Sequence, residues 1–179
     1  FIAARMKAKR DFAPANAFEL HLYGRYCNAS KFAGEIDAFE AIEDVKKRYA
    51  IDENRIVAMG FSMGGGEVAR YMSRYGGQSV VQAVLVSSVL PFRLKTDDNP
   101  EGVDRQVFED IKAAIAKDRY AYFKDFLDNF YNVDKLMPDR ISEPAWRASF
   151  DVAAGSSPFA TYACVDTWLT DFRDDLPRI

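Results

Sequence analysis

Residues 55–64 read Arg-Ile-Val-Ala-Met-Gly-Phe-Ser-Met-Gly, which joins a strand pattern to a turn motif. Its first half, Arg55–Met59, is a short apolar run of the kind that forms a buried strand. Its second half, Gly60–Gly64, has the spacing Gly-x-Ser-x-Gly, which predicts a sharp turn. The residues that follow, Gly65–Arg74, have a helical pattern. Because the motif lies between a predicted strand and a predicted helix, its context favours a functional serine over an incidental one.

A turn of this type gives two backbone-positioned groups a chemical role. The strained turn lifts the Ser62 hydroxyl clear of the sheet, so Ser62 is the candidate nucleophile. We expect the glycines because the turn leaves little room for a Cβ near the serine. The backbone N–H of Met63 lies at the start of the predicted helix, where it and the helix dipole can stabilise a developing oxyanion. We therefore predict Ser62 as nucleophile and Met63 as oxyanion-hole donor.

The chain around this motif predicts an α/β fold. A second apolar run, Ala83–Val89, follows the predicted helix, so the two strands are expected to be parallel and joined by a right-handed βαβ crossover. Upstream, apolar residues recur at three- and four-residue steps from Gly34 to Tyr49 and predict a helix. Before that helix, Phe18–Tyr23 alternates apolar and polar residues, which favours a strand.

After Pro91 the pattern changes to helices rich in aromatic residues. Four helices are predicted: Val103–Lys117, Arg119–Tyr131, Glu143–Ala154 and Pro158–Phe172. An all-helical insert after a core strand is typical of a cap over an active site, and the same aromatics also suit a core between helices. We therefore expect a partial core in residues 1–91 and a helical cap region in residues 92–179, leading toward further core strands that the sequence does not contain.

Net charge, hydrophobic runs and cysteine spacing limit the classes of function that this chain can have. The 179 residues carry a formal net charge of −3, which argues against nucleic-acid binding. No apolar run approaches the roughly 20 residues that span a bilayer, so no membrane segment is expected. Cys27 and Cys164 lie far apart in no metal-ligand spacing, which predicts free thiols in a reducing compartment and favours the cytoplasm. We expect neither a cofactor nor a metal.

Two resemblances can be seen along the chain, and they meet at Ser62. Residues 60–179 resemble cofactor-free haloperoxidase and perhydrolase-type esterases of the α/β-hydrolase superfamily, through GFSMGGGEVARYMSRYGG, AVLVSSVLPFRLKTDDNPEGV, VFEDIK and DTWLTDFRDDLPRI. Upstream, ELHLYGRYCNASKFAGEIDAFEAIEDVKKRYAIDENRIV resembles the prolyl-oligopeptidase-like and depolymerase-like esterases. The chain therefore looks like a chimera of two esterase branches, C-terminally truncated, with a partial α/β-hydrolase fold.

These resemblances imply a serine hydrolase that acts on small carboxylic esters, with peracid formation from a carboxylic acid and hydrogen peroxide as a side activity. In the haloperoxidase-like branch the triad acid and histidine follow the DLPRI segment, so we expect neither in this chain and activity that is weak or absent. The alternative is a non-catalytic remnant. A sheet of three or four strands would leave unpaired edges, which favours self-association or a site completed by another chain.

The chain's own candidates for the missing triad members are weaker. Its one histidine, His21, precedes Ser62, which is the wrong order for this fold, so we interpret it as a hydrogen-bonding residue of a strand edge or turn. Glu67, after the glycine run, is expected to be a buried polar or capping residue. Three further carboxylates are interpreted as solvated surface: Asp97, Asp98 and Asp171.

Overall fold

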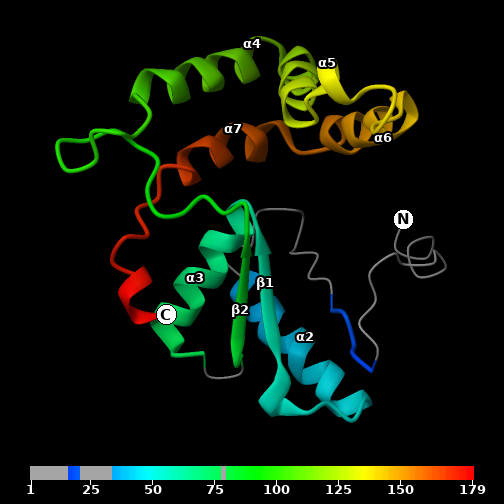
Figure 1. The fold of residues 1–179 in the computed structure, drawn as a ribbon, viewed down its shortest axis with the longest axis vertical. Coiled ribbons are helices and arrows are strands. Elements are labelled where there is room, and N and C mark those ends of the chain that lie inside the picture. Colours follow the sequence, from blue (N-terminus) through cyan, green and yellow to red (C-terminus); the bar gives the residue numbers. More distant parts are fainter. Residues whose placement is uncertain (1–15, 21–33, 78–79) are drawn as a thin grey trace.

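The computed structural model describes residues 16–20, 34–77 and 80–179 (Figure 1). The elements, in chain order, are the helix α2 (Gly34–Arg48), the 3-10 turn η2 (Glu53–Arg55), the strand β1 (Val57–Phe61), the helix α3 (Met63–Tyr75), the strand β2 (Gln82–Val86), the helices α4 (Arg105–Phe130), α5 (Val133–Leu136), α6 (Glu143–Ala154) and α7 (Pro158–Thr167), and the 3-10 turn η3 (Leu176–Arg178). Figure 1 shows two parts, with β1, β2, α2 and α3 below and the helices α4 to α7 above the carboxyl ends of the strands.

The lower part contains the predicted βαβ unit. β1 and β2 pair in parallel, with Val57 opposite Gln82 and Phe61 opposite Val86. The helix α3 connects them and packs against both strands. This arrangement confirms the predicted parallel α/β fold around the Gly-x-Ser-x-Gly motif.

Both strands differ in their bounds from the prediction. β1 begins at Val57 rather than Arg55, because the Asp52 side chain accepts a hydrogen bond from Asn54 N (3.0 Å) and caps the 3-10 turn that includes Arg55. β2 ends at Val86 rather than Val89, because Ser87 has a φ of 44° and turns the chain out of the sheet. The helix α3 also starts earlier than predicted, at Met63.

The prediction of a buried strand at Arg55–Met59 is wrong for the described part of the chain. The exposed fractions are 49% for Val57, 68% for Met59 and 54% for Phe61. Successive side chains on a strand point to opposite faces, so these three share the face away from α3 with Val84 and Val86 of β2, which the register pairs with Met59 and Phe61. α3 covers the other face only, which leaves an apolar sheet face exposed.

The helical part agrees closely with the prediction. α6 has the predicted bounds, and α4 spans two predicted helices with a kink between them. The kink lies at Asp118, which has φ −158° and ψ 93° and separates the predicted helices at the expected residue. Its side chain accepts hydrogen bonds from Tyr120 N and Ala121 N, both at 3.0 Å, and so caps the second half of α4. The four-residue helix α5 was not predicted.

α7 ends at Thr167, five residues before the predicted Phe172. After Thr167 the chain returns to the lower part, which it reaches at Phe172. Its N–H donates to the Pro91 carbonyl at 3.0 Å, and its ring packs against Gly66 of α3. The segment from residue 92 to residue 171 therefore leaves and re-enters the lower part at neighbouring backbone positions.

The principal apolar core among the described residues lies between α4 and α7. It consists of Leu94, Phe108, Ile115 and Val165, and Trp168 packs against it. Arg119, beside the kink, donates to the carbonyls of Ala154 at 2.9 Å and Ser156 at 3.0 Å and so ties α4 to the end of α6. In the described ranges no helix has the length and apolar composition to cross a bilayer.

The strand predicted over Phe18–Tyr23 is only partly described. Residues 17–20 form neither helix nor strand. The Phe18 ring packs against the Tyr49 ring, with their centroids 4.8 Å apart. His21, Cys27 and the rest of residues 21–33 lie outside the described residues. Cys164 is a free thiol, as predicted.

Candidate active site

Ser62 occupies a strained turn at the junction of β1 and α3. It has φ 53° and ψ −115°, a positive φ that serine seldom adopts, and it is the N-cap residue of α3. Backbone strain of this kind costs about 1–3 kcal/mol and persists only where the surroundings impose it. The strand before and the helix after the serine are those that the motif predicts.

The strained conformation is held by backbone hydrogen bonds on both sides of Ser62. Ser62 N donates to the Val86 carbonyl at 3.0 Å, and the Ser62 carbonyl accepts from Gly65 N and Val89 N, both at 3.2 Å. The N–H and the carbonyl of Ser62 are thus both held, by β2, by the segment that follows β2 and by α3. We refer to residues Gly60–Gly64 as the Ser62 turn.

Only some of the glycines are required by space. A Cβ on Gly60 would overlap the Gly64 carbonyl, and a Cβ on Gly65 would overlap the Ser88 hydroxyl. A Cβ on Gly64 would meet no atom within 4 Å. The expectation that the turn excludes a Cβ is therefore confirmed for Gly60 and wrong for Gly64, whose added methyl would point into open space.

Among the described residues, the Ser62 hydroxyl and the Met63 amide are both without a hydrogen-bond partner. Met63 is the first residue of α3, where a backbone N–H has no acceptor within the helix. Within the described part of the chain, neither the Met63 N–H nor the Ser62 hydroxyl makes a hydrogen bond. The two predicted site residues are therefore adjacent at a helix N-terminus, where the dipole favours negative charge.

The Met63 side chain is held by the end of α7. Its sulfur accepts a hydrogen bond from Trp168 Nε1 at 3.0 Å and lies 4.0 Å from Cys164 Sγ. Sequence reasoning missed this contact because Trp168 follows α7, far from Ser62 in the chain, and an aromatic residue there reads as core.

A row of aromatic rings leads away from the Ser62 turn along the second half of α4. The rings of Phe61 and Phe130 meet edge-on, with their centroids 6.5 Å apart. Phe130 stacks on Phe126 with a centroid distance of 5.8 Å, and the centroids of Phe126 and Tyr122 lie 6.0 Å apart. The members on α4 are four residues apart and share one helix face. Phe61, Phe126 and Phe130 are 54%, 43% and 53% exposed, and burial raises the pKa of the Tyr122 phenol.

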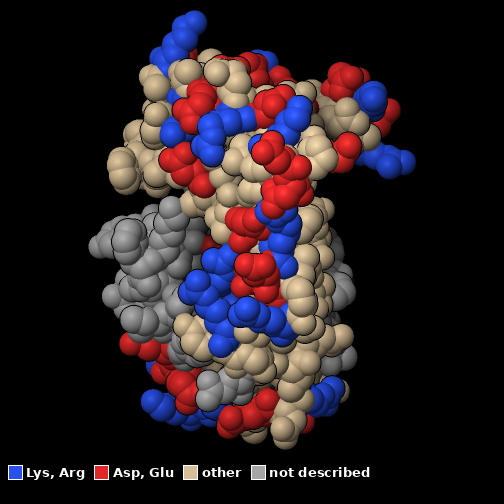
Figure 2. Space-filling view, turned by 90° about the vertical axis from the view of Figure 1, so that its left-hand side faces the viewer, with Lys and Arg blue, Asp and Glu red and all other residues tan. Residues whose placement is uncertain are grey.

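The carboxylates named from the sequence lie away from this arrangement. Asp98 and Asp171 both pair with Arg173, at 3.0 and 2.6 Å, and are exposed as predicted, and Asp97 is exposed as well. The pKa of Asp98 is lowered by hydrogen bonds from Thr96 and then Arg173, and that of Asp171 chiefly by Arg173. Basic and acidic side chains lie intermixed on the face shown in Figure 2. Glu67 is exposed, so its interpretation as a buried residue is wrong.

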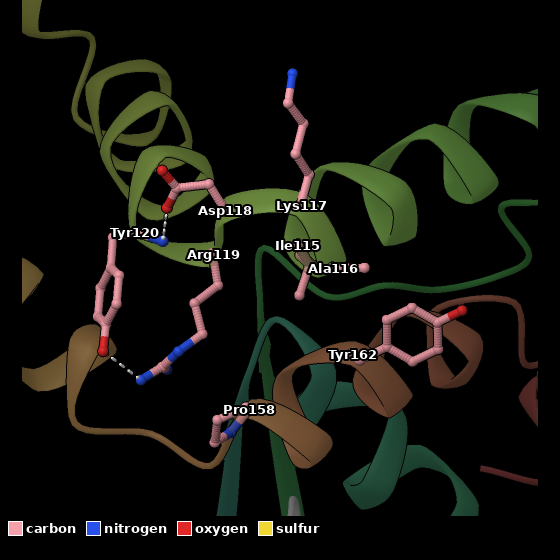
Figure 3. A pocket seen from close by; sticks show the side chains of 8 residues that line it. All are labelled: Ile115, Ala116, Lys117, Asp118, Arg119, Tyr120, Pro158 and Tyr162. Carbon is pink, nitrogen blue, oxygen red and sulfur yellow. Dashed lines mark hydrogen bonds between the residues drawn. The ribbon is translucent and has the colours of Figure 1, made fainter.

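Among the described residues no cluster of three His, Cys, Asp or Glu side chains could hold a metal ion. A pocket of about 380 Å³ lies at the kink of α4 (Figure 3), between residues 115–120 and the side chains of Pro158 and Tyr162. None of its lining residues belongs to the Ser62 turn. The Asp118 cap and the Arg119–Tyr120 hydrogen bond form part of its wall, so it follows from the kink itself.

A parallel βαβ unit with a strained serine at its crossover, below a group of helices, defines an α/β-hydrolase. Comparison with solved structures agrees. A bromoperoxidase from Bacillus anthracis superposes with a TM-score of 0.67 and 33% identity, over 80% of this chain and 52% of that one. The chain belongs to the family described as alpha/beta hydrolase of unknown function (DUF915), whose model matches residues 24–135.

Curated relatives show which enzymes within this family the chain resembles. A protein of Synechocystis sp., whose name describes it as a candidate non-heme chloroperoxidase, is 57% identical over 129 residues, 72% of this chain and 47% of that protein. A bifunctional esterase/perhydrolase of Acinetobacter calcoaceticus is 38% identical over 128 residues, 69% of this chain and 45% of that protein. The chain thus spans about half the length of the curated relatives it matches, and the predicted kinship with haloperoxidase-type enzymes is confirmed.

Proposed function

We propose that the protein is a serine hydrolase of carboxylic esters, with perhydrolase-type side activity, in which Ser62 is the nucleophile. The observation that carries the proposal is the backbone of Ser62, which is strained at the start of a helix and fixed by three hydrogen bonds. The Ser62 hydroxyl attacks the acyl carbon and loses its proton to a base or to water, and the carbonyl oxygen becomes an oxyanion beside the Met63 N–H. The intermediate then collapses, the bond to the alcohol breaks, the alcohol leaves with a proton, and water hydrolyses the acyl-serine to the carboxylic acid. Relatives named for esterase, perhydrolase and haloperoxidase activity support this reaction class.

The aromatic row supports an apolar substrate. Phe61 directly precedes the nucleophile, and Phe130 and Phe126 continue its exposed surface along α4. Burying an aromatic or aliphatic group of an ester against such rings is favourable by about 25 cal/mol per Å² of apolar surface removed from water. A small ester with an apolar acyl or alcohol group therefore fits this wall.

Turnover is expected to be weak. No described residue offers a base to the Ser62 hydroxyl, and the one histidine, His21, lies outside the described residues. Loss of a triad member lowers kcat by several orders of magnitude and leaves a residual rate from the oxyanion hole and binding. A reactive but slow serine is the expected state of this chain.

Covalent labelling tests the nucleophile without requiring turnover. An excess of an alkyl fluorophosphonate should modify the folded protein at Ser62, as located by peptide mass spectrometry, and should leave Ser62→Ala unmodified. Ser87 and Ser88 follow β2 close by and serve as internal controls, because neither caps a helix. Absence of an adduct at Ser62 after prolonged exposure would contradict the proposal.

The two-branch origin of the chain stays a prediction. One family model spans residues 24–135 and so covers both sides of Ser62, which lends no support to a junction there.

A second candidate function is favoured by the exposed sheet face. Val57, Met59 and Phe61, with Val84 and Val86, form an apolar surface next to strand edges that have no partner in the described part of the chain. Exposed strand edges and contiguous apolar surface promote association. In this alternative the chain acts by pairing with a second chain, either a copy of itself or one that completes the site.

Sedimentation velocity distinguishes this alternative. If the face mediates association, Met59→Lys should weaken self-association about tenfold or more, because a charge would be desolvated at the contact. Val152→Lys is the matched control, since Val152 is 66% exposed on α6, away from the sheet. A wild-type protein that stays monomeric at high concentration would contradict the self-association form of the alternative.

A further inference from the structure

The Met63 side chain places an oxidisable sulfur atom beside the Ser62 turn. Met63 is the first residue of α3, and on a helix the Cα–Cβ bond tilts toward the N-terminus, which is the end where the Met63 N–H also points. The helices α4 to α7 lie above the carboxyl ends of the strands (Figure 1), and the sulfur meets them at the end of α7. The ester chemistry proposed above makes no use of this atom.

The surroundings of the sulfur leave it able to react. Met63 Sδ accepts a hydrogen bond from Trp168 Nε1 at 3.0 Å and lies 4.0 Å from Cys164 Sγ. A thioether sulfur has two lone pairs, so the indole N–H leaves one of them for another partner. Met63, Cys164 and Trp168 are each half-buried, so the sulfur is not sealed inside a core. A sulfoxide oxygen is a better acceptor than a thioether, and the Trp168 N–H is therefore suited to the oxidised form as well.

We propose that the Met63 thioether is a modification site, which a peracid held at the Ser62 turn oxidises to the sulfoxide. This rests on the proposed function, in which the same turn binds acyl groups and forms peracids. A peracid whose carbonyl oxygen accepts from the Met63 N–H has its peroxy group within one side-chain length of the sulfur, because the N–H and the sulfur belong to one residue.

The oxidation is a transfer of one oxygen atom. A sulfur lone pair attacks the terminal peroxy oxygen, the O–O bond breaks, and the proton of that oxygen passes to the departing carboxylate. The thioether is oxidised to the sulfoxide, and the peracid is reduced to the carboxylic acid. Oxidation makes an apolar, flexible side chain polar. At Met63 it changes the contact between the Ser62 turn and α7, so the product of the side activity alters its own site.

Two other methionines make the test internal to one protein. Met59 is 68% exposed, and Met72 is half-buried like Met63 but lies near the opposite end of α3. Hydrogen peroxide has no acyl group and should oxidise Met59 ahead of both. A limiting amount of meta-chloroperoxybenzoic acid, whose ring suits the aromatic row, should raise the ratio of Met63 to Met59 sulfoxide about tenfold or more above its value with hydrogen peroxide, because a bound oxidant acts at a high effective concentration. The ratio of Met72 to Met59 sulfoxide should not rise. Peptide mass spectrometry at low conversion measures both ratios.

Two controls locate the effect. The reduced probe, meta-chlorobenzoate, should compete for the Ser62 turn and return the Met63 ratio to its value with hydrogen peroxide. Cys164→Ser removes the neighbouring thiol as an alternative oxygen acceptor, and the preference for Met63 should persist in this variant. The inference is overturned by a Met63 ratio that is equal with the two oxidants, that meta-chlorobenzoate does not lower, or that loses its rise in Cys164→Ser.

A further reagent mixture separates this inference from the proposed function. Hydrogen peroxide with ethyl butyrate supplies a peracid through an acylated Ser62, so the Met63 ratio should rise in the wild type and stay low in Ser62→Ala. Absence of that rise counts against the proposed perhydrolase activity. The comparison of the preformed peracid with hydrogen peroxide does not depend on turnover, and it decides the inference in either case.

Discussion

Gly60→Ala is expected to destabilise the protein by about 3 kcal/mol or more, because the added methyl would overlap backbone atoms. The same substitution should abolish fluorophosphonate labelling of Ser62. Its Cβ would overlap the Gly64 carbonyl and Gly65 N, all backbone atoms of the first turn of α3. Those atoms cannot rotate away as a side chain would. The strand end and the helix start would have to separate, and Ser62 would lose the conformation that exposes its hydroxyl. Urea unfolding and labelling rates measure the two effects.

Gly64→Ala is the control from the same motif. Its Cβ meets no atom within 4 Å, and alanine is favoured over glycine inside a helix by up to about 1 kcal/mol. The variant should therefore be as stable as the wild type or slightly more stable. If both substitutions proved equally tolerated, the geometry of the turn described above would be wrong.

Arg70→Ala is expected to cost roughly 2–3 kcal/mol, because Arg70 joins α3 to the returning C-terminal segment. Its Nε and Nη2 both lie 2.9 Å from Asp175 Oδ2, Nη2 donates to the Asp171 carbonyl at 2.9 Å, and the guanidinium lies 4.9 Å over the Phe172 ring. The Asp175 side chain is 10% exposed and would be left as a buried, unpaired carboxylate. Arg70 itself is 29% exposed, so the loss should be below that of a fully buried pair.

A double-mutant cycle checks that the loss comes from the pair. Asp175→Asn removes the charge that Arg70 neutralises, and the costs of the two substitutions should not add. Lys124→Ala provides the surface comparison, since the Lys124–Asp128 pair is exposed and four residues apart on α4, and its loss should stay below about 0.5 kcal/mol. Thermal or urea unfolding of the four variants gives the comparison.

Much of the local structure could be predicted because its signals are local. The break at Asp118 and the bounds of α6 follow from hydrogen bonds that a residue makes within a few positions of itself, such as Ser142 accepting from Ala145 N. The turn at Ser62 was predictable for the same reason. The premature end of α7 was not, because it depends on Phe172 reaching Pro91 and Gly66, contacts far apart in the sequence.

The same distinction applies to the candidate site. The positions of Ser62 and Met63 follow from a five-residue motif, whereas the residues that surround them come from α4 and α7. No motif or spacing in the sequence distinguishes Trp168 and Phe130 from the many aromatic residues packed between helices. The burial of β1 could not be predicted correctly from its sequence. An apolar run shows that a strand is suited to being covered on both faces, but the covering elements come from elsewhere in the fold.

The hydrogen bond between Phe172 N and the Pro91 carbonyl has a consequence for how such a chain can change. Residues 92–171 depart from and return to nearly the same point, so this stretch has the geometry of an insertion between two fixed ends. Insertions whose ends lie close together can be lengthened, replaced or exchanged at little cost in loop-closure entropy. Phe172 and Asp175, which bind α3, would remain with the sheet after such an exchange. Substrate preference could then be inherited as a separate module, while the Ser62 turn stays unchanged beneath it.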